Sequence, residues 1–308
     1  MRRVFTVAAL TALVCSPALG QPQVDYSRLE IKTTDMGHGV YLLGWQGGDS
    51  LILVGDDGVL LVDTSVAAMG DKIRAAITKV SNKPIRIIIN THAHADHFGA
   101  NESLAKGGAV IVGHENLRDR MAKGQHLAAF NQTIPPSPPA ALPTMTYSDS
   151  MTLHFDGETV ELFHVPNAHT DNDTLVHFER ANVLHASGTF GGDGAYPFFD
   201  TSSGGSLAGM IAAEEKMLSL ADDKTKIMAD EGEPAGTVVL RATYDMLVAL
   251  RARVQNLIDE GKSEDEVVAA KPTEGLDARF ARASGFLTGE VFTRMAYQSL
   301  KSGPSSSR

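Results

Sequence analysis

Four side chains that can bind a metal or move a proton crowd into six positions, at His92, His94, Asp96 and His97. They directly follow an apolar, β-branched run that predicts a buried strand. In an extended segment residues i and i+2 face the same side, so His92 and His94 can reach one cation. Such a density of imidazole and carboxylate at a strand end is unfavourable unless something binds it, and zinc held by three histidines is the usual solution.

A third imidazole is found far downstream, at His169, within the segment 166–173. It again follows a predicted strand, and small and polar residues surround it, as a tight loop facing a metal requires. The alternative is a set of ordinary surface histidines. A lone His-x-His would be a weak signal, but a cluster with a remote partner favours a metal site built from His92, His94 and His169.

The chemistry expected of such a site is hydrolysis. A metal held by three neutral imidazoles keeps its charge and lowers the pKa of bound water from 15.7 to about 7. Asp96 is expected to orient the nucleophile and to carry its proton. Asp96 and His97 fall at the start of a helix that points back toward the same site, and they are candidate ligands as well.

The elements that must position these residues alternate between strands and helices. Short apolar runs within 39–63, turned at 56–58, predict an antiparallel meander. Apolar residues at helical spacing follow within 73–80, then a buried strand at 85–89. A weaker helix and strand follow within 102–112. We expect the candidate histidines at the end of the buried strand.

The second half repeats this alternation. Thr237 is expected to cap a long helix that Gly261 stops, and Ser263 and Glu266 form a capping box for a shorter one. Strands are predicted at 151–165, 174–178, 182–186 and 226–228, and a helix at 207–220.

Strands with interspersed helices, beginning with antiparallel pairs, predict a sheet-on-sheet core covered by helices. The Pro-rich stretch 135–143 is long for a connection, so it is either a functional loop or lid, or a tolerated insertion. No boundary is evident within 21–301, which predicts one domain with C-terminal helices. The polar tail 302–308 is expected to be disordered.

The first twenty residues differ from the rest. Arg2 and Arg3 precede an apolar run at 4–14 that is too short to span a bilayer, and a small-x-small pattern ends at Gly20. Residues 1–20 are therefore expected to be a signal peptide, which predicts a periplasmic or secreted protein without an integral membrane segment after cleavage. The only cysteine, Cys15, lies within this segment, so no thiolate remains in the mature chain.

The net charge of the chain argues against one class of binding partner, the nucleic acids. The 308 residues carry a formal net charge of -10. Binding to a nucleic-acid backbone requires a basic face, which this composition does not predict. A small-molecule substrate is expected instead, while the oligomeric state is left open.

The pattern His92-Ala-His94-Ala-Asp96-His97, with His169-Thr170 downstream, resembles the metallo-β-lactamase superfamily over about residues 35–260. Asp63 also matches. The resemblance implies an α+β fold, a four-layer αββα sandwich of two mixed sheets flanked by helices. It further implies that His92, His94 and His169 hold a first metal, and that Asp96 and His97 contribute to a second.

The chain departs from this family at two positions. A bridging carboxylate is expected where Gly188 stands, and the last histidine where Glu231 stands. Either Glu231 is a substitute oxygen ligand, or the second site is lost or weakened. We favour one tightly bound zinc with a weakened second site. His185 and Asp193 are nearby alternatives expected to be structural.

The leading expectation is an exported zinc-dependent hydrolase of a cyclic amide or ester, with a β-lactam as the first candidate substrate. A lactonase, thioesterase or sulfatase of the same superfamily is the alternative, because the motif reports the metal and not the leaving group. A non-catalytic metal-binding protein with a degenerate site is the rival from another class, and Gly188 and Glu231 motivate it.

Overall fold

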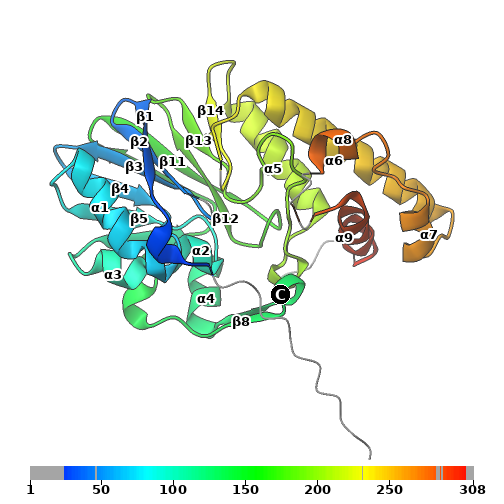
Figure 1. Ribbon diagram of the computed structural model, residues 1–308, viewed down its shortest axis with the longest axis horizontal. Coiled ribbons are helices and arrows are strands. Elements are labelled where there is room, and N and C mark those ends of the chain that lie inside the picture. The colour runs from blue at the N-terminus through cyan, green and yellow to red at the C-terminus, as the bar shows by residue number, and fades with distance from the viewer. Residues whose placement is uncertain (1–23, 46, 231, 282–284, 286, 303–308) are drawn as a thin grey trace, which may run out of the picture.

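The computed structural model describes residues 24–45, 47–230, 232–281, 285 and 287–302 (Figure 1). The predicted signal peptide, Glu231 and residues 303–308 lie outside these ranges, so the predictions made for them stay predictions. Within the described part of the chain, no helix is both long and apolar enough to cross a membrane.

The first sheet is mixed and holds the meander predicted from the sequence. Its first four strands pair antiparallel, and the remaining three join in parallel through crossovers. Its order is β1 (Lys32–Gly37), β2 (Val40–Gly44), β3 (Ser50–Gly55), β4 (Gly58–Val62), β5 (Ile85–Ile89), β6 (Val110–His114) and β9 (Met145–Tyr147).

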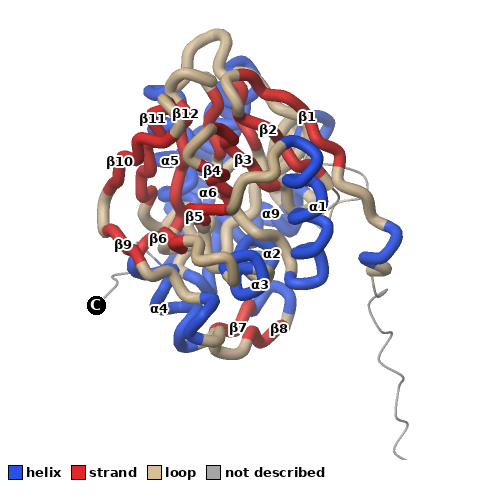
Figure 2. The backbone as a smooth tube through the Cα atoms, turned by 90° about the vertical axis from the view of Figure 1, so that its left-hand side faces the viewer, coloured by secondary structure: helices blue, strands red, loops and turns tan. Residues whose placement is uncertain are grey.

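The second sheet is also mixed, and its last pair is parallel. Its order is β10 (Ser150–Phe155), β11 (Glu158–Val165), β12 (Asp173–Phe178), β13 (Val183–His185) and β14 (Lys226–Met228). A separate hairpin of β7 (Gln125–Leu127) and β8 (Gln132–Ile134) lies apart from both sheets (Figure 2).

Helices cover the outer face of each sheet. On the first sheet, α1 (Gly70–Val80) and α3 (Asn101–Ala105) bury Ile73 and Leu104 against strand residues such as Ile88. On the second, α5 (Leu207–Leu220), α6 (Thr237–Asp259) and α9 (Gly289–Ser302) form the largest apolar cluster. The shorter helices are α2 (Ala95–Phe98), α4 (Glu115–Lys123), α7 (Glu264–Ala269) and α8 (Asp277–Phe280).

The core between the sheets follows from the alternation of side chains along the strands. Leu51, Leu53 and Leu60 of the first sheet meet Leu162 and Val176 of the second in one buried cluster. Since β3 and β4 bury their other face beneath the helices of the first sheet, almost every residue of these two strands is buried. The four-layer αββα sandwich is therefore the observed fold.

Local details confirm some predictions and correct others. The capping box of Ser263 and Glu266 is formed. Thr237 is the first residue of α6 and not its cap, because the cap is Gly236 with extended backbone. Ser302 does not belong to the tail: its hydroxyl donates to the Gln298 carbonyl at 2.8 Å, so α9 continues through it.

The Pro-rich stretch packs on the body of the protein. The Ser137 N–H donates to the Met121 carbonyl of α4 at 2.8 Å, and the Asn101 side chain donates to the Ala141 carbonyl at 2.9 Å. Ala141 and Leu142 are buried against α4 and α2 residues. The hairpin that precedes the stretch, and not the prolines, reaches the candidate site described below.

Candidate metal centre

His92 and His94 lie on the loop between β5 and α2, and His97 lies within α2. The buried Asn90 side chain holds this loop through Asn101, donating to the Asn101 side-chain oxygen at 3.1 Å and accepting from its amide at 2.7 Å. The Asn90 N–H donates to the Val112 carbonyl of β6 at 2.9 Å. The start of the loop that presents the histidines is therefore held by both α3 and β6.

The loop after β11 carries His169 and is bonded directly to the first loop. The Ala93 N–H donates to the Asn172 side chain at 2.8 Å, and the Thr174 N–H donates to the Thr91 carbonyl at 2.9 Å. These bonds explain how residues 75 positions apart in sequence come together. The fold thus brings His169 to the histidines of the first motif, as the sequence predicts.

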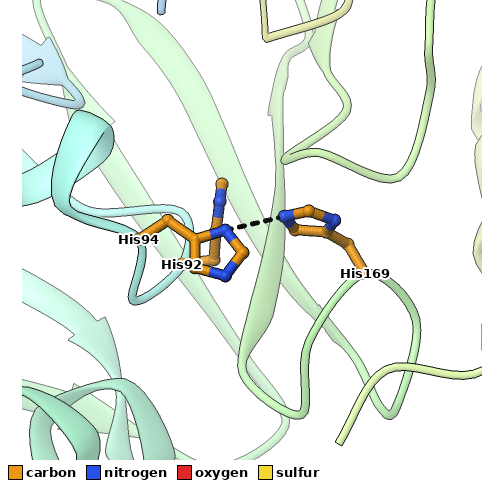
Figure 3. A group of neighbouring side chains, drawn as sticks. All are labelled: His92, His94 and His169. Atoms are coloured by element: carbon orange, nitrogen blue, oxygen red, sulfur yellow. Dashed lines mark hydrogen bonds between the residues drawn. The ribbon is translucent and has the colours of Figure 1, made fainter. Parts of the chain in front are cut away.

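The rings of His92, His94 and His169 form a nearly equilateral triangle. Their centroids lie 4.8, 4.7 and 4.7 Å apart, and each pair of rings is close to perpendicular. Figure 3 shows the three rings converging, with His169 Nε2 and His94 Nδ1 at 3.0 Å. One ring nitrogen of each residue lies within 4.8 Å of the others.

Hydrogen bonds behind the rings determine which nitrogens carry protons. His169 Nδ1 donates to the Phe198 carbonyl at 2.8 Å, and His94 Nε2 donates to the Asp200 carboxylate at 3.2 Å. The Thr91 hydroxyl donates to Asp63, so it accepts from His92 Nδ1 at 3.1 Å. The three nitrogens that face one another are therefore unprotonated in the neutral rings.

This donor set fits a cation. Three lone pairs converge on one point, and the buried His92 Nε2 has no hydrogen-bond partner. Burial, with neighbouring imidazoles, lowers the pKa of His92 and lowers that of His169 to about 3, which disfavours a proton on either of these rings. Three neutral imidazoles with outer partners on their other nitrogens match a zinc site.

A second cluster adjoins the first. His97 Nε2 lies 3.6 Å from an Asp96 oxygen and 3.8 Å from an Asp230 oxygen, and the His92 and His97 ring centroids are 4.0 Å apart. Ring nitrogens of His92 and His97 and an Asp230 oxygen could share one ion. The side chain of Asp96 is 49% exposed, so it is the most solvent-exposed of these three groups.

The second cluster contains more carboxylates than imidazoles, so its charge is predominantly negative. Burial alone would lower the pKa of His97, but the carboxylates of Asp230, Asp96 and Asp63 outweigh it and raise that pKa to about 10. Burial, opposed by His97 and assisted by Asp96 and Asp63, raises the pKa of Asp230 to about 7. The cluster therefore favours an added positive charge.

Asp230 is a candidate ligand that sequence reasoning missed. The turn after β14 was expected to supply Glu231, which lies outside the described residues, whereas its neighbour Asp230 faces His97. The Gly188 N–H donates to Asp230 Oδ1 at 2.7 Å, and the Asp49 N–H donates to the Asp230 carbonyl at 2.6 Å. The signal was present in the sequence, because both acidic residues occupy the same turn.

Asp63 positions His97 by binding its Nδ1 nitrogen. It accepts from His97 Nδ1 at 2.7 Å, from the Thr91 N–H at 2.8 Å and from the Thr91 hydroxyl at 2.6 Å. Asp63 is fully buried and has a positive φ of 59°. A strained, buried carboxylate that binds three donors of the motif is a positioning residue, since it leaves His97 Nε2 to face Asp96 and Asp230.

Gly188 stands where the family's bridging carboxylate is expected, and the geometry leaves no room for one. Its φ is +64°, and a Cβ at this position would lie 2.5 Å from His169 Cδ2. Any side chain here must displace His169. The close approach of this backbone is also what lets its N–H reach Asp230.

Gly188→Ala is therefore expected to destabilise the chain by about 1–3 kcal/mol, through overpacking against His169 and the left-handed backbone. Urea unfolding of the metal-free protein measures this. Gly107→Ala is the matched control, because nothing lies within 4 Å of a Cβ there. Equal unfolding midpoints for the two variants would contradict the close contact.

Several further histidines and Trp45 have structural contacts. His114 accepts from the Asn116 N–H at 3.2 Å as the cap of α4, and its ring stacks on His164 with centroids 3.7 Å apart. Trp45 packs beside Tyr26 on the first sheet. His185 is buried beneath the centre, and burial lowers its pKa to about 4.

A cavity of about 590 Å³ opens beside both clusters. Its wall includes His92, His94, His97 and His169 together with a larger set of apolar side chains. That set comprises Val66, Ala95, Leu127, Phe130, Ile134, Phe190, Ala195, Tyr196, Phe198, Ala229, Phe280 and Leu287. A small molecule in this cavity would therefore lie beside the histidine cluster.

Known proteins share this fold. A solved metallo-beta-lactamase from Pontibacter korlensis matches with a TM-score of 0.57 and 18% identity over 71% of this chain and 99% of that one. The inverting sec-alkylsulfatase Pisa1 from Pseudomonas sp. matches with a TM-score of 0.64 and 16% identity over 87% of this chain and 50% of that one.

Two curated relatives are similar in sequence. The linear primary-alkylsulfatase of Pseudomonas sp. (strain ATCC 19151) is 23% identical over 252 residues, covering 69% of this chain and 47% of the relative. The 2,4-dinitroanisole O-demethylase subunit alpha of Nocardioides sp. (strain JS1661) is 28% identical over 144 residues, covering 46% and 40%. The chain spans less than half the length of either relative.

The family assignment rests on a direct match to residues 43–224, which is more than half of the chain. That range contains β3 and β4 of the meander, both histidine loops and α5. The described fold agrees with it in its two mixed sheets and outer helices. The chain belongs to the metallo-beta-lactamase superfamily.

Proposed function

We propose that this protein is a zinc-dependent hydrolase. The observation that carries the proposal is the convergence of three unprotonated ring nitrogens, His92 Nε2, His94 Nδ1 and His169 Nε2, on one point beside an open cavity. These residues would hold the metal, with zinc as the best fit to an all-imidazole set. When bound, such an ion lowers the pKa of water from 15.7 to about 7 and polarises a carbonyl or sulfuryl oxygen.

Asp96 is the residue suited to proton transfer. Its carboxylate lines the cavity, is about half exposed and lies next to His97. It can accept the proton of the attacking water and deliver it to the leaving group. Asp200 and the Phe198 carbonyl orient His94 and His169, which keeps the ring nitrogens directed at the reacting centre.

A second, weaker metal is proposed at Asp96, His97 and Asp230. The excess of carboxylates around His97 supports it. Asp230 would supply the oxygen ligand that was expected from Glu231. This set offers one imidazole and two carboxylates, so we expect it to lose its ion to a chelator before the three-histidine site does.

The proposed reaction is hydrolysis of an ester or cyclic amide. Sulfate-ester hydrolysis is the second candidate, because the Pisa1 alkylsulfatase matches 87% of this chain and the primary-alkylsulfatase matches 69%. Both candidates use the same nucleophile and differ in the bond that breaks.

The proposal predicts about one tightly bound zinc per chain and a turnover that depends on it. Metal content would be measured by mass spectrometry, and activity with nitrocefin, an aryl ester, a lactone and an alkyl sulfate. Chelation should abolish turnover, and zinc should restore it. Tight metal binding without turnover of any of these would favour the binding-protein alternative, while failure to bind zinc would refute the hydrolase.

A further inference from the structure

The cavity beside the metal centre is walled by aromatic and aliphatic side chains. Within the described residues that line it, Asp96 and Asp230 are the only carboxylates, both next to the histidines, and no lysine or arginine contributes. Gln132 of β8 is the one amide side chain among these lining residues, and the rest of the lining away from the histidines is apolar. Its volume of about 590 Å³ is in the range of sites for small organic molecules.

Two segments outside the sandwich build this apolar end. The β7–β8 hairpin contributes Leu127, Phe130 and Ile134, and the segment after α8 contributes Leu287. Phe280, the last residue of α8, adds an aromatic ring. Since these segments differ from the metal-binding loops, they can determine the substrate without changing the chemistry.

The walls are connected to the metal ligands. The Phe198 ring lies between Phe130 and His169, at centroid distances of 5.5 and 5.6 Å, and its carbonyl accepts from His169 Nδ1. Apolar surface thus begins directly at a metal ligand. Phe198 and Phe130 are therefore apolar surfaces available to the part of a substrate next to the histidines.

Tyr196 anchors the C-terminal wall. Its hydroxyl donates to Asp277 Oδ1 at 2.7 Å, its N–H donates to the Phe280 carbonyl at 2.7 Å, and its ring stacks on Phe292 with centroids 4.5 Å apart. These contacts tie the C-terminal helices to the segment after β13. The position of Phe280 in the cavity is therefore fixed by packing.

We propose that the part of the substrate away from the reacting bond is apolar and uncharged, and that Phe130 and Phe280 determine this specificity. The inference rests on the proposed hydrolase for the reacting bond, but it concerns the rest of the substrate. A carboxylate placed at this end would lose its hydration without gaining a cation among the described residues. Alkyl or aryl groups, in contrast, bury their surface against the rings.

The test uses three esters of 4-nitrophenol: the acetate, the hexanoate, and the monoester of adipic acid, which matches the hexanoate in length but ends in a carboxylate. For the zinc-loaded protein, kcat/KM for the hexanoate should exceed that for the acetate and the adipate by about 10-fold or more, because added methylenes fill an apolar pocket. Similar values for the three esters would overturn the inference and leave the hydrolase standing. A preference for the adipate would also overturn it.

Phe130→Ala is the informative variant. This side chain is 48% exposed, so its loss should not unfold the chain. We expect the ratio of hexanoate to acetate turnover to fall about 3-fold or more, as apolar contact is lost. Met145→Ala is the matched control, because Met145 is 45% exposed on β9 and does not line the cavity. An unchanged ratio in Phe130→Ala would remove Phe130 from the proposal.

A binding measurement separates this inference from the reaction. The neutral fluorophore N-phenyl-1-naphthylamine should bind the metal-free protein, bind Phe130→Ala more weakly, and be displaced by methyl hexanoate more readily than by monomethyl adipate. If no ester is hydrolysed but this pattern holds, the hydrolase fails and the apolar site stands. If the fluorophore does not bind, or both esters displace it equally, the apolar site is refuted.

Discussion

Replacing His94 with alanine is expected to abolish both tight zinc binding and hydrolysis. His94 Nδ1 is one of the three nitrogens that converge, 3.0 Å from His169 Nε2, and Asp200 holds the ring from behind. Loss of an outer partner costs about 10- to 100-fold in metal affinity, and loss of the ligand itself should cost more. Zinc content after dialysis against a chelator, and kcat/KM for the best ester, measure the two effects.

His154→Ala is the control for this experiment. His154 is an exposed histidine on the edge strand β10. Its replacement tests whether the loss of a histidine outside the cluster has the same effect as the loss of His94. The His154→Ala variant should leave zinc content and turnover unchanged. If His94→Ala retained one zinc per chain and measurable hydrolysis, the three-histidine centre would have to be abandoned as the reactive site.

Most strands of the two sheets, and the pairing of His92 with His94, could be predicted because they depend on local patterns. The run at Ile85–Ile89 is β-branched and apolar, and the structure has a strand with those bounds. The helix expected at Leu207–Leu220 likewise has those bounds. His92 and His94 follow the strand at a spacing that places them on one side, so only the approach of His169 required tertiary structure.

Residues that act through others could not be found in this way. Asp200 lies 106 residues from His94, and Asp63 lies 34 residues from His97. No periodicity links such pairs, because strand order and loop packing determine which carboxylate lies behind which ring. The apolar end of the cavity has the same origin, since Phe130 and Phe280 line one cavity only after the hairpin and the C-terminal helices have packed.

The centre therefore depends as much on a layer of buried hydrogen-bond acceptors behind the histidine rings as on the candidate ligands themselves. Asp200 and Asp63 are buried acceptors that fix the tautomers of His94 and His97. Such a layer is needed before a metal arrives, because four imidazoles at centroid distances of 4.0–4.8 Å cannot satisfy one another. Its energetic contribution can be measured without any metal.

Replacing Asp63 should destabilise the metal-free protein strongly. Asp63→Ala removes the acceptor for His97 Nδ1 and both Thr91 donors, and breaking a buried charged network in this way costs about 3–5 kcal/mol. Asp63→Asn keeps the shape and tolerates the positive φ, so we expect a smaller loss of about 1–3 kcal/mol. Urea unfolding in the presence of a chelator gives both free energies of unfolding.

The Asp63→Asn variant should also change which nitrogen of the neutral His97 ring carries the proton. With the side-chain carbonyl of the introduced amide accepting from the Thr91 N–H, its NH₂ group would point at His97 Nδ1, which must then accept, so the proton moves to Nε2. His97 would then face Asp96 and Asp230 as a donor and not as a ligand. Loss of the weaker metal with retention of the three-histidine zinc is the expected stoichiometry. Asp223→Asn, in an exposed turn before β14, should alter neither stability nor stoichiometry. If Asp63→Asn behaved like that control, Asp63 would not be what orients His97.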